Sequence, residues 1–127
     1  MPDTLTPPSL PRTPAEVAAA VLDRIEQYPE MFDMNNWAVL PTGVLEPGDD
    51  IQCGTTMCIA GWAAHLTGYT LHRTPDGLGA YARKDGRRYE VEFAAARVLG
   101  VDEVAAAQLF WDPADVALAQ LREIAGR

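Results

Sequence analysis

Lysine is almost absent from this chain, in which Lys84 stands beside nine arginines among 127 residues. Long apolar runs are missing too, because Asp, Arg, His or Gly interrupts each one well short of the about 18 residues that a membrane span needs. The first residues, MPDTLTPPSLPRTP, contain no apolar core of the kind that a signal peptide requires. These absences exclude a membrane protein and predict a cytoplasmic one.

Cysteine is also scarce, and both copies, Cys53 and Cys58, lie in the string CGTTMCIAGWA. In a reducing compartment such a pair is more typical of free thiols, metal ligands or a transient redox couple than of a permanent bridge. The net charge of -8 argues against general attraction to nucleic-acid phosphate. No motif in the sequence implies a cofactor.

Positive charge is concentrated in one segment between residues 73 and 88. This segment carries a local excess of three positive charges, whereas the rest of the chain is strongly acidic. Its basic residues are Arg73, Arg83, Lys84, Arg87 and Arg88. The charge pattern predicts an acidic body with one basic projection, which we interpret as a candidate partner-binding surface.

Residues 1–13 contain four prolines and no periodic apolar pattern, so they are expected to form an extended arm. Residues 14–127 are expected to form a single helical domain. Thr13, Pro14 and Glu16 predict a helix start, and helical periodicity continues to Tyr28. Four further helices are predicted from Thr55 or Thr56 to about Leu66, from about Glu92 to Gly100, from 102 to 111 and from 113 onward.

The pair Asp85-Gly86, flanked by AYARK and RRYEV, predicts a β-hairpin with a two-residue turn. In that hairpin Arg83 faces Arg88 and Lys84 faces Arg87, and like charges directly opposite one another are unfavourable. A bound anion would remove this penalty. Together these patterns predict a mainly α protein, a compact bundle of four to five helices with one small β-hairpin.

Cys58 is a candidate nucleophile, because a thiol in the first turn of a helix feels the positive end of the helix dipole. Cys53 would be its resolving partner in a redox reaction. His65 is about 10 Å away along the helix, too far to accept the thiol proton, so His72 is the candidate base. No Asn or Asp stands at a spacing diagnostic of a cysteine protease, and the protein is therefore not expected to be an enzyme.

The same sulfur pair has other interpretations. Two cysteines and two histidines, Cys53, Cys58, His65 and His72, would suffice for one tetrahedral zinc, but their spacing matches no common zinc finger. A short disulfide between the cysteines is sterically possible. The interpretation that we favour is packing: the cysteines fix a turn, Gly54 permits an unusual backbone angle, and Gly61 lets another helix approach.

The stretch AARVLGVDEVAAAQLF has the tight-corner spacing of a helix-turn-helix DNA reader, with Gly100 at the corner. The second helix of this pair, EVAAAQLF, offers Gln108 as its one amide and contains neither Arg nor Lys. It therefore lacks the side chains that contact base edges and phosphates. No sequence-specific DNA binding is expected.

Three strings resemble a group of small uncharacterised proteins from bacteriophages and actinobacteria: FDMNNWA, CGTTMCIAGWA and AARVLGVDEVAAAQLFW. The resemblance covers Phe32 to Trp111. The matching residues of its CGTxxCIAGWA signature are Cys53, Gly54, Thr55, Cys58, Ala60, Gly61 and Trp62. The resemblance implies a phage or prophage origin and a site centred on this turn, and it supplies no catalytic assignment.

The sequence therefore leads to one main hypothesis and one alternative. The main hypothesis is a small acidic accessory protein that acts through protein-protein contacts, using the basic hairpin or the arm. The alternative is a cysteine-dependent enzyme or thiol redox protein that uses Cys58.

Overall fold

The computed structural model describes residues 11–49, 51, 54–77 and 79–127. Within them lie five α-helices: α1 Pro14–Gln27, α2 Ile59–Leu66, α3 Val91–Leu99, α4 Glu103–Trp111 and α5 Ala114–Ala125. The strands are β1 Ala38–Val39, β2 Val44–Leu45, β3 Thr56–Met57, β4 Thr70–Arg73, β5 Ala80–Lys84 and β6 Arg87–Glu90. A 3-10 turn, Pro29–Met31, follows α1.

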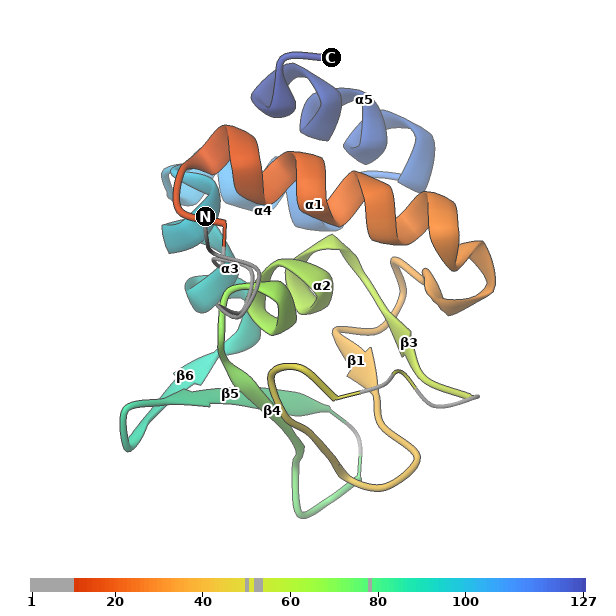
Figure 1. Ribbon diagram of the computed structural model, residues 1–127, viewed down its shortest axis with the longest axis vertical. Coiled ribbons are helices and arrows are strands. Elements are labelled where there is room, and N and C mark those ends of the chain that lie inside the picture. Colours follow the sequence, from red (N-terminus) through yellow and green to blue (C-terminus); the bar gives the residue numbers. More distant parts are fainter. Residues whose placement is uncertain (1–10, 50, 52–53, 78) are drawn as a thin grey trace, which may run out of the picture.

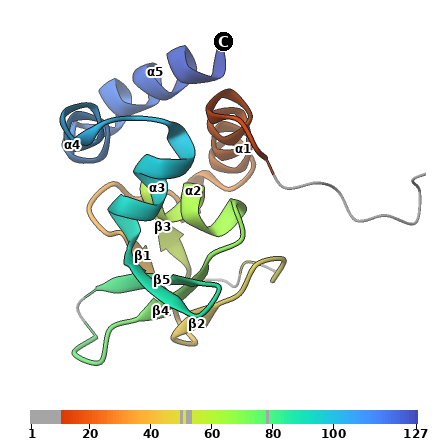
Figure 2. The same ribbon diagram turned by 90° about the vertical axis from the view of Figure 1, so that its left-hand side faces the viewer.

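The elements are arranged in layers. Helices α1, α4 and α5 lie at one end, the strands at the other, and α2 and α3 between them (Figures 1 and 2). Strands β2, β4, β5 and β6 form an antiparallel sheet in the order β2-β4-β5-β6, and β1 pairs with β3 in a separate two-stranded sheet. The chain therefore has a mixed α/β fold.

The predicted helical bundle with one hairpin is thus wrong. The hairpin exists, with Asp85 and Gly86 both at positive φ in its turn. However, β4 adds a third strand to it and β2 adds a fourth. Strands β1, β2 and β3 are two residues long, so their hydrophobic alternation is too short to be seen in the sequence.

The predicted start of α1 is confirmed. Thr13 Oγ1 accepts a hydrogen bond from the Glu16 amide, and the Glu16 carboxylate accepts one from the Thr13 amide, which makes a complete capping box. Proline at the first helical position needs no amide partner there. Of the predicted arm, only residues 11–13 belong to the described part of the chain.

Helix α2 is the centre of the core. Its residues Ile59 to Ala64 are buried on every side, as expected for a helix surrounded by other elements. It begins later than predicted, since Thr56 and Met57 pair with β1 and Cys58 becomes the N-cap residue. None of the helices in the described part of the chain has the length and apolar character needed to cross a membrane.

Candidate functional site

The three strings of the resemblance meet at Trp37. Its ring contacts Phe110 and Trp111 edge to face, with ring centroids 6.2 and 5.5 Å apart. Its backbone carbonyl accepts a hydrogen bond from the Cys58 thiol at 3.7 Å. The segments FDMNNWA, CGTTMCIAGWA and QLFW therefore pack on one another, which gives the signature a structural role.

Gly61 is the point of closest approach in this junction. A Cβ atom at this position would lie 2.2 Å from the Trp37 carbonyl oxygen and 3.0 Å from Met57 Cβ. We predicted that Gly61 allows another helix to approach. The structure shows that the backbone of Trp37 approaches it instead. Gly54 adopts a φ of 93°, so the prediction of an unusual backbone angle there is confirmed.

The Cys58 thiol is buried and protonated. The residue is 1% exposed, and burial raises the pKa of its thiol to about 11 despite backbone hydrogen bonds from Gly61 and Ala60 that lower it. Desolvation therefore outweighs the helix-dipole effect on which the nucleophile hypothesis depends. Cys58 carries a free thiol, and its hydrogen-bond partner is a carbonyl rather than a histidine.

We predict that Cys58 resists alkylation in the native protein. With a pKa of about 11, roughly one thiol in a thousand is ionised at pH 8, and the sulfur is also shielded from reagent. In a Cys53→Ser variant, iodoacetamide should label Cys58 rapidly in denaturant and at least about a hundredfold more slowly without it. Rapid native labelling would contradict burial and restore the thiol-enzyme alternative.

The two histidines lie in different places. His65, on α2, is 6% exposed and contacts the Trp62 ring at 6.3 Å, whereas His72, on β4, stacks on Tyr81 at 5.1 Å. No group of three or more potential metal ligands occurs among the described residues. Cys53, a member of both the zinc set and the redox pair, lies outside the described residues.

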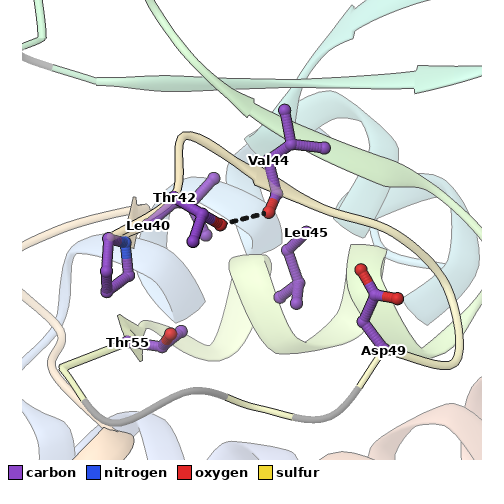
Figure 3. Close-up of a pocket in the computed structure, with 7 residues that line it drawn as sticks. Leu40, Thr42, Val44, Leu45, Asp49 and Thr55 are labelled. Carbon is purple, nitrogen blue, oxygen red and sulfur yellow. Dashed lines mark hydrogen bonds between the residues drawn. The ribbon is translucent and has the colours of Figure 1, made fainter.

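A pocket of about 240 Å³ lies beneath β2 (Figure 3). Its wall includes Leu40, Leu45 and Thr55, and at its rim the Thr42 hydroxyl donates to the Val44 carbonyl at 3.0 Å. Within the described part of the chain, Asp49 is the one titratable residue of the lining. No base, nucleophile or cation accompanies this carboxylate among the described lining residues.

The five basic residues of the candidate binding surface do not act together. Lys84 Nζ donates to the Thr67 carbonyl at 3.1 Å and lies over the Tyr69 ring. Arg73 lies against Gly43 and donates to the Leu40 carbonyl at 3.5 Å. These two side chains thus contact the body of the protein, although Arg73 is still exposed. Arg83, Arg87 and Arg88 are exposed as well.

Arg83 and Arg88 share the exposed face of the four-stranded sheet, which we name the outer face. The strand register places Val44 beside His72, His72 beside Tyr81, and Arg83 beside Arg88. Leu71 and Ala82 point to the opposite face and are fully buried. Arg87 lies on that opposite face, next to Lys84.

The side chains of the outer face form a stacked row. The His72 and Tyr81 rings are 11° from parallel, and the Arg88 guanidinium lies 3.9 Å from the centroid of the Tyr81 ring. Both faces of Tyr81 are therefore occupied. This contact holds the Arg88 guanidinium in place, and a hollow of about 540 Å³, which Glu90 and Glu92 also line, opens beside Tyr81 and Arg88.

Arg83 and Arg88 face one another directly across β5 and β6. Neither forms an ion pair with any described residue. Like charges in this position destabilise a sheet by some tenths of a kcal/mol. The pair thus has no ion-paired carboxylate among the described residues, although Glu90, two residues from Arg88 on β6, lies on the same face.

Sequence reasoning found the cations of this site and missed its aromatic residues. Tyr81 and His72 come together through the pairing of β4 with β5, and β4 was not predicted. Alternation in TLHR and AYARK, with His72 and Tyr81 on the polar side of each string, was the available signal.

Comparison of the chain with known proteins found no matching family, no matching curated protein and no matching solved structure.

Proposed function

We propose that this protein acts by binding rather than by catalysis, and that its outer face receives an acidic segment of a protein partner. The observation that carries the proposal is the Arg83–Arg88 pair, two exposed arginines directly opposite one another that form no ion pair within the described part of the chain. An arriving carboxylate would remove their repulsion and could bind either guanidinium through paired hydrogen bonds.

The arrangement of Tyr81 favours a protein partner over single-stranded nucleic acid. Proteins that bind unpaired bases stack them on open aromatic faces. Here one face of Tyr81 is covered by His72 and the other by Arg88. The outer face also carries two guanidinium groups, the exposed apolar side chain of Val44 and the carboxylate of Glu90, which pairs with Tyr81. An acidic peptide therefore fits at the Arg83–Arg88 pair, toward the hairpin turn, rather than beside Glu90.

A role as an accessory or regulatory protein of phage type accords with this activity. It is supported by the resemblance of the CGTxxCIAGWA signature to small bacteriophage and actinobacterial proteins. The thiol-enzyme alternative gains no support from the buried, protonated Cys58. The other expected binding segment, the arm of residues 1–13, lies largely outside the described residues.

The test is a single charge reversal, Arg83→Glu. This substitution should abolish capture of the partner in a pull-down, because a carboxylate then occupies the partner's position beside Arg88. The same substitution places opposite charges across β5 and β6, so the free energy of unfolding should be unchanged or higher by a few tenths of a kcal/mol. Quantitative mass spectrometry of the captured proteins and chemical denaturation measure the two effects.

Arg122→Glu is the matched control, since it changes the net charge equally at an exposed position on α5. It should leave capture intact. Nuclease treatment of the lysate separates the two partner classes, and capture should survive it. Equal capture by wild type and Arg83→Glu, or loss of capture after nuclease, would refute the proposal.

A further inference from the structure

A second surface of the molecule is an open apolar groove between α3 and α4. Its volume is about 560 Å³, and its walls include Phe93 and Ala96 from α3 and Phe110 and Trp111 from α4. Phe93 is 53% exposed and Trp111 is 71% exposed. Large aromatic side chains that line one hollow while facing solvent mark interaction sites more often than isolated exposed residues do.

The core does not require these two rings. Phe93 stacks on the half-buried Tyr89 ring at 6.1 Å, and Trp111 makes an edge-to-face contact with Trp37. By contrast, their neighbours Ala94, Ala95, Leu109 and Phe110 are buried. Covering exposed apolar area of this kind with another surface lowers the free energy, because that area is removed from water.

The rim of the groove is acidic. It carries four carboxylates and one cation; the carboxylates are Glu90, Glu92, Asp102 and Glu103. The cation, Arg97, is directed toward the Tyr89 ring, 6.0 Å from its centroid. None of the four carboxylates forms an ion pair with a described residue.

Two of these carboxylates crowd each other. Burial raises the pKa of Glu92, and the neighbouring Glu90 side chain raises it further by hydrogen bonding and by charge repulsion. A cation placed between them would relieve that repulsion. The rim is therefore complementary to lysine or arginine side chains. Glu90 and Glu92 also line the hollow beside Tyr81 and Arg88, so the groove and the outer face adjoin at these two residues.

We propose that the α3–α4 groove docks an amphipathic helix of a protein partner, with apolar side chains seated against Phe93 and Trp111 and basic side chains on the carboxylate rim. A helix is the fitting shape because the groove runs between two helices, and of its described lining residues only Glu90, the last residue of β6, belongs to a strand. Phe93 and Trp111 act as the apolar anchors, and the carboxylates select the charge of the partner.

The test uses two synthetic helical peptides of about 18 residues, or five turns, one built from Leu and Lys and the other from Leu and Glu. The Leu/Lys peptide should bind the intact protein and shift the fluorescence of the exposed Trp111. Phe93→Ser should weaken binding of the Leu/Lys peptide about tenfold or more. The double variant Glu92→Gln/Glu103→Gln, which removes two negative charges, should weaken binding and make it less dependent on salt concentration.

Val104→Ser is the matched control. Val104 lies on α4, as Trp111 does, and is 71% exposed, but it does not line the groove. The Val104→Ser variant should therefore bind the peptide like wild type. Thermal unfolding of each variant shows that the fold is retained. Arg83→Glu should also bind the Leu/Lys peptide normally, which separates this proposal from the proposed function of the outer face.

Three outcomes would overturn the proposal. The first is equal binding of the Leu/Glu peptide, and the second is equal loss of binding in Phe93→Ser and Val104→Ser. The third is the absence of any binding to the Leu/Lys peptide. Sedimentation over a range of concentrations tests whether a second copy of this chain occupies the groove. Self-association that Phe93→Ser abolishes would show that the occupant is a surface of this same chain and not a helix of another protein.

Discussion

Gly61→Ala is expected to unfold the protein or to lower its free energy of unfolding by about 3 kcal/mol or more. The added methyl group would lie 2.2 Å from the Trp37 carbonyl oxygen, and this neighbour is backbone that cannot rotate away. Relief requires Trp37 to move, which would break the hydrogen bond from Cys58 and disturb the ring contacts with Phe110 and Trp111. Denaturant unfolding followed by circular dichroism measures the loss.

Gly79→Ala is the matched control for this substitution. A Cβ atom there would lie 3.8 Å from the Thr74 hydroxyl, an ordinary contact, and the residue is not at positive φ. Its stability should stay within about 0.5 kcal/mol of wild type. If Gly61→Ala is as stable as Gly79→Ala, the close approach of Trp37 to α2 is incorrect.

Acid is expected to destabilise the protein through His65. Burial lowers the pKa of this residue to about 4, with a smaller lowering by Arg24 on α1 and an opposing effect from Asp49. The unfolded chain, in which a histidine has a pKa of about 6.5, therefore binds a proton that the folded protein does not. The free energy of unfolding therefore has its full value above about pH 6.5 and decreases as the pH falls from 6.5 toward 4. The decrease due to His65 amounts to about 2 to 3 kcal/mol between pH 7.5 and 4.5.

The measurement is a comparison of unfolding free energies at the two pH values for wild type, His65→Leu and His65→Gln. Both variants remove the titrating group, so the decrease on acidification should be smaller than in wild type by about 2 kcal/mol in each. Their stabilities at pH 7.5 will differ, because one buries an apolar and the other a polar side chain. Equal acid sensitivity in all three proteins would show that His65 does not control this response.

The helices of this fold are readable from sequence, and most of the strands are not. Thr13 with Glu16 and Gly100 at the end of α3 give local signals at the helix ends, and the structure uses both. Strands β1 and β3 have no local signal, because they exist only through pairing between segments about 20 residues apart. The same pairing moved the start of α2 from the predicted threonines to Ile59.

The site was predictable in composition and not in geometry. The sequence identifies Arg83 and Arg88 as neighbours, since hairpin register follows from Asp85-Gly86. It does not reveal that Lys84 and Arg73 bond to backbone carbonyls, or that Tyr81 supports Arg88. For Cys58 the position at a helix start was foreseeable, but burial depends on Trp37 and the surrounding core, and burial sets the pKa of the thiol.

Helix α1 packs against α5, nearly the full length of the chain away (Figure 1), and the ring of Trp37 contacts Phe110, which is synthesised much later. During synthesis, α1 and the segment around Trp37 therefore lack their packing partners until α4 and α5 have left the ribosome. Folding of this protein should be a late event governed by distant contacts, even though the described residues include five α-helices, whose backbone hydrogen bonds are local.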